Sequence, residues 1–434
     1  MRFPDTWATR AKDVTPELLL QLHALPSLKL LDLGGCGLTS LPDGFFAGLS
    51  EQLEVLNLAE NRLEALPADI GALTNLVRLG LKGNRLTALP ALTALVKLQA
   101  SFNRLTDLPD ELERCERLEL FRVACCRIER LPASLARLPA LSWFSIAGNP
   151  VADALSLAAE PRRRHVPLVT IRSLALGPKL GCGASGDVWR AHWDGRDVAV
   201  KIFEGEVSPD GRAADEEAVA LALADPGLVR VLARLEAPRG LVLGLVEGRP
   251  LAEKPNHASL LRCRWDPATR LALGPTLRAA RDVAAALAYL HSQGIAHGDV
   301  YAHNVLATPD GRAVLCDYGA AFYYDRSEAP YFEAHEVRAY GLLLQGLLRQ
   351  LDIGFEGMET ALSTQKALAS LAQSCLHPRP DRRPSFATLT GILRSFQQSA
   401  HPRGTSSLQE EEAQSLRSSR LVLTPGSTTS TELE

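Results

Sequence analysis

The sequence predicts a protein of two parts, a solenoid of short repeats followed by a separate α+β domain. A leucine pattern recurs at short intervals through residues 28–150. A glycine-rich loop and two strand-like segments follow at residues 180–201, and two aspartates and an asparagine lie between residues 299 and 317. With 434 residues, of which 46% are apolar and 22% charged, each part is long enough to bury a core of its own.

The first part contains six units of the pattern Leu-x-x-Leu-x-Leu-x-x-Asn, with conservative replacements. Such a pattern buries the leucines of each short strand against the neighbouring units, while the asparagine satisfies backbone groups where the chain turns away. Cys36 and Cys126 take the asparagine position in two units. The segment resembles a leucine-rich repeat array, which implies an α/β horseshoe arc over residues 1–150, including an N-terminal cap. The units begin at Leu28, Leu53, Leu76, Leu95, Leu118 and Leu141.

The function of this array is expected in its variable positions, because the leucines belong to the core. A charged concave strip with an exposed tryptophan is typical of a protein-binding surface, although a merely solvated face fits the pattern equally well. We therefore predict a protein partner on the concave face. The residues expected to face it are Arg78, Lys82, Lys97, Gln99, Arg122 and Trp143.

The glycine loop at residues 180–188 can close over the phosphates of a nucleotide, because residues without a Cβ let backbone N–H groups approach an anion. Similar loops open dinucleotide-binding folds, but those need a helix directly after the glycines. Here residues 187–191 alternate like a strand, and residues 194–195 form a hairpin turn signal. A second strand then leads to Lys201, which favours a lysine-bearing hairpin over a dinucleotide site.

The order of the loop, the lysine, Asp299, Asn304 and Asp317 is that of a protein kinase. Residues 171–397 therefore resemble a protein kinase domain, and the resemblance implies a bilobal α+β fold that uses ATP and Mg²⁺. Carboxylate and amide oxygens are the ligands that Mg²⁺ and an incoming hydroxyl need.

The resemblance also implies a role for each matching residue. Lys201 would pair with the α- and β-phosphates, and Glu216, with Glu217 as the next candidate, would be its partner on a helix. Asp299 would accept the proton of the substrate hydroxyl, while Asn304 and Asp317 would hold Mg²⁺. Residues 381–386 resemble an arginine motif near the end of the large lobe of kinases. Its arginine, Arg383, would anchor the activation segment, which follows Asp317. The nucleotide would be bordered by Leu180, Gly181, Gly183, Gly186, Val188, Ala199 and Lys201.

Several positions depart from the family pattern. Gly298 stands where many kinases carry an arginine that receives a phosphorylated loop, so switching by loop phosphorylation is not expected. Tyr301 replaces a lysine usual in serine/threonine kinases, and His303 replaces an arginine usual in tyrosine kinases, so these positions leave the hydroxyl specificity open. The segment between Asp317 and an apolar helix expected at residues 337–348 is short. The surface that binds a peptide substrate is therefore expected to be reduced.

Two other functions remain open at this point. Residues 297–304 also fit the pattern of small-molecule phosphotransferases such as the aminoglycoside kinases, but the complete glycine loop and the Arg383 motif argue against that family. A pseudokinase scaffold would retain binding alone, and the presence of Lys201, Asp299, Asn304 and Asp317 argues against it. We predict an ATP- and Mg²⁺-dependent protein kinase that acts on serine or threonine, with substrates recruited by the repeats.

Composition agrees with this prediction. The net charge of −3 gives no reason to expect nucleic acid or an anionic membrane as a partner. No apolar run reaches the roughly 18 residues of a membrane span, and the eight cysteines lack metal-ligand spacing, so we expect reduced thiols and a cytoplasmic protein. Residues 151–170 are expected to form a linker and residues 398–434 a disordered tail. Either the kinase core folds on its own residues, or the array packs on it as a structural or inhibitory cover.

Overall fold

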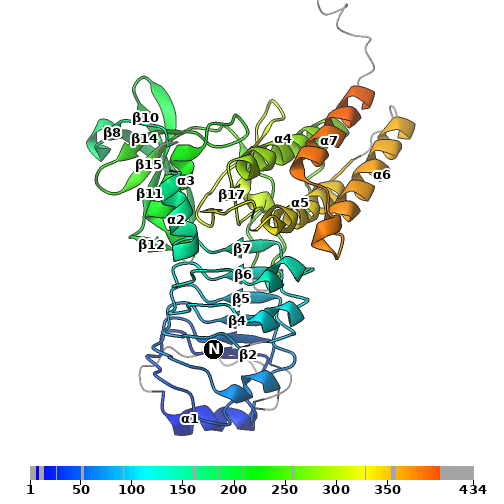
Figure 1. The fold of residues 1–434 in the computed structure, drawn as a ribbon. Coiled ribbons are helices and arrows are strands. Elements are labelled where there is room, and N and C mark those ends of the chain that lie inside the picture. The colour runs from blue at the N-terminus through cyan, green and yellow to red at the C-terminus, as the bar shows by residue number, and fades with distance from the viewer. Residues whose placement is uncertain are drawn as a thin grey trace, which may run out of the picture.

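The chain forms a stack of short parallel strands that carries a two-lobed domain at its end (Figure 1). This computed structural model describes residues 6–8, 14–25, 27–49, 53–90, 92–159, 163–183, 185–208, 210–256, 259–327, 329–352 and 358–400. Nearly all of the tail predicted from residue 398 therefore lies outside the described residues.

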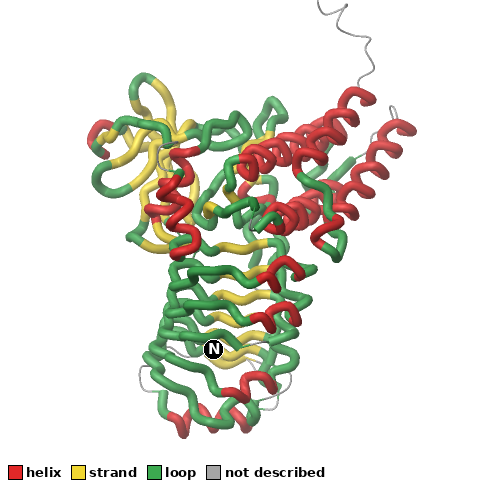
Figure 2. The backbone as a smooth tube through the Cα atoms, in the orientation of Figure 1, coloured by secondary structure: helices red, strands yellow, loops and turns green. Residues whose placement is uncertain are grey.

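The stack is one parallel sheet of seven strands that follow one another in chain order. Six of them coincide with the six leucine units, and one further strand precedes the first unit. Short helical turns lie along one side of the stack (Figure 2). The strands are β1 (Thr6–Ala8), β2 (Leu30–Asp32), β3 (Val55–Asn57), β4 (Arg78–Gly80), β5 (Lys97–Gln99), β6 (Leu120–Arg122) and β7 (Trp143–Ser145), and the helical elements are α1 (Pro16–Gln21) and the 3₁₀ turns Leu22–Ala24, Ala68–Ala72, Asp110–Arg114 and Ala133–Arg137.

Asparagine side chains connect successive repeats, as the sequence pattern predicts. The amide nitrogen of Asn84 donates to the carbonyl of Leu58 at 2.9 Å and to that of Leu81 at 3.0 Å. Its oxygen accepts from the amide of Leu63 at 3.0 Å. At the equivalent position Cys126 makes two long Sγ contacts, of 3.6 Å with the carbonyl of Ala100 and of 3.7 Å with that of Ala124. The side chain at this position thus satisfies buried backbone groups that the turn leaves unpaired.

The smaller lobe of the second domain is a six-stranded sheet covered by one helix. Asp194 and Gly195 have positive φ values of 52° and 73° in the turn of the predicted hairpin, the geometry that a two-residue hairpin favours. The sheet order is β8 (Leu168–Val169), β14 (Val231–Leu235), β15 (Gly240–Gly244), β11 (Arg196–Phe203), β10 (Gly186–Trp193) and β9 (Ala175–Gly183), with the small hairpin β12 (Val207–Ser208) and β13 (Gly211–Arg212) and the helix α3 (Ala213–Ala222).

The larger lobe is mainly helical. The apolar helix expected at residues 337–348 is longer and begins at Tyr331, which shortens the segment after Asp317 further. The elements are α4 (Leu273–Ser292), α5 (Tyr331–Arg349), α6 (Met358–Cys375), α7 (Phe386–Ala400) and the 3₁₀ turns Ala302–Asn304 and Pro380–Arg382, with the sheet of β16 (Arg249–Pro250), β18 (Val305–Ala307) and β19 (Ala313–Leu315) and the pair β17 (Ile295–Ala296) and β20 (Phe322–Tyr323).

The two parts share a continuous apolar core, which favours the alternative in which the array packs on the kinase core. Strand β7 lies directly against the larger lobe (Figure 1). The ring of Phe144 in β7 stacks on Phe332 of α5, with centroids 5.4 Å apart, and meets Phe322 of β20 edge-on at 6.0 Å. In β2 to β5 only the central residue is buried, whereas all three residues of β6 and β7 are buried. The second domain therefore covers the concave face of the last two repeats.

Part of the segment expected to be a linker is structured. Residues 150–158 form the helix α2 (Pro150–Ala158), which begins with a proline at its first position, where no backbone N–H is needed. Asp153 of α2 forms an ion pair of 2.6 Å with Arg212 of the smaller lobe. Beyond the helix, the guanidinium of Arg163 donates to the carbonyl of Ser156 at 2.7 Å. This helix therefore fixes the repeats to the smaller lobe as well.

Candidate active site

A cavity of about 350 Å³ lies between the two lobes, below the glycine loop. Every residue that the sequence suggested for catalysis, the nucleotide or the metal lines it, with the exception of the suggested base Asp299. These residues are Leu180, Gly181, Gly183, Gly186, Val188, Ala199, Lys201, Glu216, Asn304 and Asp317. Asp299 lines an adjoining cavity of about 170 Å³, and the two cavities share Lys254, His303 and Asp317.

The glycine loop is the turn between β9 and β10, where Gly181 pairs with Val188 and Gly183 with Gly186. Gly186 has a φ of +147°, and a Cβ there would lie 2.0 Å from the carbonyl oxygen of Ile202. Only glycine fits this close approach of two backbones, which brings the loop over the cavity.

Lys201 projects from β11 into the cavity and contacts two carboxylates. Its ammonium group donates to Oε1 of Glu216 on α3 and, at 3.2 Å, to Oδ1 of Asp317. Burial acts to lower the pKa of Lys201, but Asp317 and Glu216 more than offset it, so the pKa is raised and the group stays charged. The suggested pair of Lys201 and Glu216 is therefore formed, while Glu217 instead contacts Arg239 at 2.9 Å.

Asp299 is held on both of its carboxylate oxygens. Oδ2 accepts from the amide nitrogen of Asn304 at 2.9 Å. Oδ1 accepts from the guanidinium of Arg122 at 2.6 Å, although Arg122 belongs to the repeat array and precedes Asp299 by 177 positions. The carboxylate that the sequence suggested as a base thus has a fixed orientation toward the smaller cavity.

Asp317 lies on a strained backbone with a φ of +68°, which non-glycine residues rarely adopt. Lys201 lowers the pKa of Asp317 to about 2, so this carboxylate is ionised at neutral pH. Among the described residues no three carboxylate, histidine or cysteine side chains converge closely enough to hold a metal. A cation held by Asp317 and Asn304 would therefore take its remaining ligands from phosphate oxygens and water, as Mg²⁺ usually does.

Glu336 of α5 is a supporting residue that sequence reasoning missed. Its Oε2 accepts from the backbone amide of His297 at 3.1 Å, and its Oε1 accepts from that of Gly298. The same carboxylate contacts Nε2 of His291 at 2.9 Å. It therefore anchors the start of residues 297–304, the loop that carries Asp299 and Asn304 and is called the catalytic loop below.

Two polar residues of the smaller cavity, Asp210 and Lys254, were also missed, and a third, His303, was noted only as a departure from the family pattern. Asp210, from the turn between β12 and β13, lies near Asp299, and burial raises the pKa of its carboxyl group although Arg122 opposes the shift. Lys254 reaches the carbonyl of Cys182 in the glycine loop at 3.5 Å. Burial lowers the pKa of His303 to about 4, so this side chain is neutral at pH 7. Asp210 and Lys254 are single residues in loops, and no sequence pattern could have located them.

Two of the concave residues expected to meet a partner instead face the kinase-like domain. Arg122 and Trp143 are each only 2% exposed, so the prediction of an exposed tryptophan is wrong. The indole ring of Trp143 stacks on Tyr301 with centroids 4.3 Å apart, and its Nε1 donates to the carbonyl of Val300 at 3.0 Å. Both residues look like partner-binding positions in the sequence because the partner is another part of the same chain.

Arg383 binds the repeat array in addition to the larger lobe. Its guanidinium donates to the carbonyl of Pro139 at 2.6 Å and to that of Ala334 at 2.9 Å. The sequence resemblance implied that this arginine anchors an activation segment. Its contact with Pro139 is instead to a loop of the repeats, and α5 begins only shortly after Asp317.

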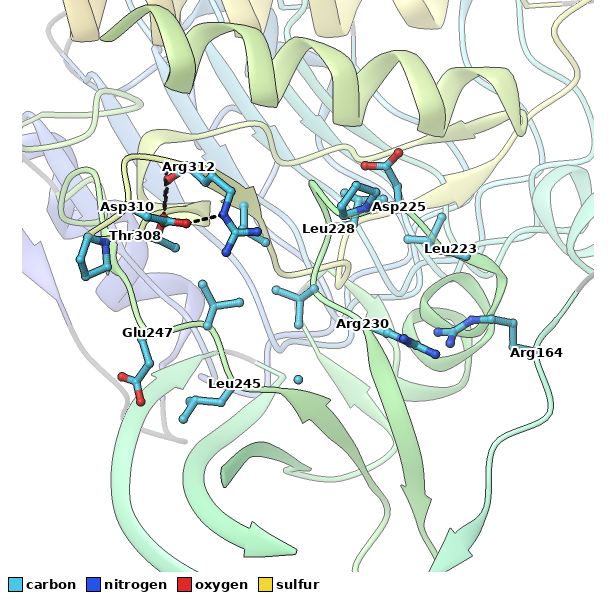
Figure 3. A pocket seen from close by; sticks show the side chains of 17 residues that line it. Arg164, Leu223, Asp225, Leu228, Arg230, Leu245, Glu247, Thr308, Asp310 and Arg312 are labelled. Carbon is cyan, nitrogen blue, oxygen red and sulfur yellow. Dashed lines mark hydrogen bonds and ion pairs between the residues drawn. The ribbon is translucent and has the colours of Figure 1, made fainter. Parts of the chain in front are cut away.

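A larger cavity of about 900 Å³ adjoins the 350 Å³ cavity and shares Val229 and residues 244–247 with it (Figure 3). It is lined by Arg164, Arg230, Asp310 and Arg312 among others, and Asp310 forms a 2.8 Å ion pair with Arg312. It contains none of Lys201, Asp299 or Asp317. We therefore assign the reaction to the two cavities below the glycine loop, where the charged groups converge.

Comparison with known proteins agrees with this architecture. The family of protein tyrosine and serine/threonine kinases matches residues 174–340, and the leucine rich repeat family matches residues 26–86. The chain therefore contains a leucine-rich repeat region followed by a protein kinase domain.

The curated relatives are kinases as well. The serine/threonine-protein kinase CTR1 of Arabidopsis thaliana is 27% identical over 270 residues, which cover 53% of this chain and 32% of the relative. The serine/threonine/tyrosine-protein kinase HT1 of the same plant is 23% identical over 269 residues, covering 52% and 67%. A probable LIM domain-containing serine/threonine-protein kinase of Dictyostelium discoideum is 24% identical, covering 59% and 43%. The matched part is thus about one third of the length of CTR1, and these names do not favour a small-molecule phosphotransferase.

No helix among the described residues is long and apolar enough to cross a membrane.

Proposed function

We propose that the protein transfers the γ-phosphoryl group of ATP to serine or threonine side chains of proteins, with Mg²⁺ as the cation. One observation carries the proposal: charged Lys201, paired with Glu216 and Asp317, faces a cavity that adjoins the oriented carboxylate of Asp299. The kinase relatives support the choice of serine or threonine.

In this proposal each side chain has one task. Backbone N–H groups of the glycine loop and the ammonium of Lys201 bind the phosphates, and Asn304 and Asp317 would hold Mg²⁺, which neutralises charge on the phosphates when bound. Asp299 accepts the proton of the attacking hydroxyl. Its two hydrogen-bonded oxygens each retain a further lone pair, so the carboxylate can still act as an acceptor.

We propose that the repeats also recruit the protein substrate, through the concave face of the repeats that the kinase domain leaves uncovered. Arg78 and Lys97 lie side by side on β4 and β5, and Lys82, which contacts Glu60 at 3.0 Å, follows β4. Arg122 and Trp143 are excluded from this surface because they are buried. A cytoplasmic location remains our prediction from the sequence.

The experiment that tests the proposed activity measures phosphate transfer from labelled ATP. The full chain is incubated with Mg²⁺ and three acceptors in parallel: generic proteins, aminoglycosides and the protein itself. Transfer to protein serine or threonine supports the proposal. Transfer to the small molecules alone, or nucleotide binding without any transfer, contradicts it.

A further inference from the structure

Arg122 joins the repeat array to two groups of the catalytic loop and to one carboxylate of the smaller lobe. Its guanidinium donates to the backbone carbonyl of Gly298 at 2.8 Å and to Oδ1 of Asp299 at 2.6 Å. Its Nε lies 3.3 Å from Oδ1 of Asp210. A planar guanidinium with several donors can hold two carboxylates and a carbonyl at once, which an ammonium group cannot do with the same geometry.

Arg122 contacts Asp299 without occupying the 170 Å³ cavity that Asp299 lines. The arginine is only 2% exposed and does not line the 170 Å³ cavity, whereas the side chain of Asp299 is 22% exposed and does line it. A residue that blocked the substrate would occupy this cavity. Arg122 instead leaves the cavity open and fixes one of its walls.

The contact is part of a buried apolar interface. Trp143 and Phe144 of β7 are buried against Tyr301 and Phe332 of the kinase domain. Removing the array would expose these apolar surfaces and leave two carboxylates without their cation, which makes a dissociable inhibitory cover unfavourable. The array thus belongs to the large lobe as its structural support.

We propose that Arg122 is a positioning residue for phosphoryl transfer, supplied by the repeat array to orient the base Asp299. This inference rests on the proposed kinase function. It also accounts for Tyr301, which stands where the resemblance expects a catalytic-loop lysine: its ring is covered by Trp143, and the cation beside Asp299 comes from Arg122.

The test compares Arg122→Gln and Arg122→Lys with the full-length wild type in steady-state transfer to a protein acceptor. Loss of orientation at a reacting group costs about 10²-fold in rate, so Arg122→Gln should lower kcat by about that factor and leave KM for ATP within about threefold. Arg122→Lys keeps the charge but not the fork of donors, and should recover about tenfold of the loss. If Arg122→Gln fails to fold, the turnover of Arg122→Lys still tests the proposal.

The matched control is Glu119→Gln, which breaks another ion pair across the same interface. Glu119 accepts from Arg262 at 2.6 and 2.8 Å and touches none of the catalytic residues. This variant should keep kcat within about threefold and lose less thermal stability than Arg122→Gln, because Arg262 is partly exposed whereas Arg122 is buried.

Three results would overturn the inference. Arg122→Gln could match the wild-type kcat, it could exceed it, as an inhibitory contact would require, or Glu119→Gln could lose as much activity. A wild-type chain that transfers no phosphate to any acceptor would instead overturn the proposed function, and this inference with it.

Discussion

At the scale of single residues, Gly298 shows how the repeats restrict which side chains the catalytic loop can carry. The sequence explains this glycine only as a missing arginine. In the structure it has a φ of +73°, and a Cβ would lie 2.5 Å from the carbonyl oxygen of Ala320 and 2.8 Å from that of Phe144 in β7. The repeat strand therefore leaves no room for a side chain at this position.

Gly298→Ala should destabilise the protein by about 2 kcal/mol or more, because it combines a left-handed backbone with two close contacts. Urea unfolding of the full chain measures the loss. The matched control is Gly195→Ala, since Gly195 also has a φ of +73° but has nothing within 4 Å of the position that a Cβ would take. Equal losses in the two variants would show that the backbone conformation alone matters and that β7 does not press on the loop.

Asp299→Asn should abolish measurable transfer, a loss of about 10²-fold or more, because an amide cannot accept the hydroxyl proton. Nucleotide affinity should stay nearly unchanged, since Asp299 does not line the 350 Å³ cavity. Calorimetric titration with an ATP analogue and a turnover assay give the two quantities. Wild-type turnover in this variant would refute the role of Asp299.

At the scale of elements, the short connection between Asp317 and α5 bears on regulation. Arg383 already binds the carbonyl of Pro139, and Gly298 offers no charge to a phosphate. Phosphatase treatment should therefore leave activity within about twofold, far from the 10²-fold scale of a loop ordered by phosphate. The measurement is turnover before and after treatment, with removal of phosphate verified by mass spectrometry. A large decrease would show that a phosphorylated segment orders the site.

His335, at the contact between α5 and the repeats, makes the stability of the protein depend on pH. It donates from Nε2 to the carbonyl of Leu135 at 3.0 Å, and burial lowers its pKa from 6.5 to about 3. The unfolded chain therefore binds a proton that the folded chain does not. The contribution of neutral His335 to the free energy of unfolding is complete above pH 6.5. It falls as the pH decreases toward 3, by up to about 1.4 kcal/mol per pH unit.

The expected outcome is a steeper fall in the free energy of unfolding below pH 6.5 for the wild type than for His335→Gln, which keeps an amide donor. Urea unfolding at pH 7.5, 6 and 5 gives the two slopes. Burial of His303 lowers its pKa to about 4 and acts with the same sign in both proteins, so the difference isolates His335. Parallel slopes would contradict the assignment.

Sequence patterns predicted the elements better than their arrangement. The Leu-x-Leu strands and the asparagine contacts follow from local spacing, and so do the hairpin with Lys201 and the pair formed with Glu216. The interface does not, because Arg122 and Trp143 have the same pattern whether their partner is another protein or a later part of the same chain. Asp210 and Glu336 were missed because tertiary packing alone brings them to the catalytic loop.

At the scale of the whole molecule, the shared core predicts that the kinase domain depends on the repeats. A chain that starts at Pro167 would expose Phe322, Phe332 and Tyr301, and Asp299 would lose Arg122. We expect this truncated protein to aggregate, or to melt at least about 10 °C below the full chain, because several buried aromatic contacts are worth more than about 1 kcal/mol each.

Light scattering and thermal melting of the two proteins, purified in the same way, measure this dependence. The full chain is the reference for both solubility and turnover. A soluble truncated protein with unchanged melting temperature and turnover would restore the view of two independent domains.

The distance along the chain between Arg122 and Asp299 has a consequence for biosynthesis. The carbonyl of Gly298 lies 176 positions after the arginine that binds it, so the solenoid has left the ribosome before the catalytic loop is made. Repeats can fold from their own neighbours, and domains generally fold in the order of synthesis. The large lobe therefore folds against a repeat array that is already folded. An mRNA that encodes the kinase domain before the repeats should yield far less active enzyme.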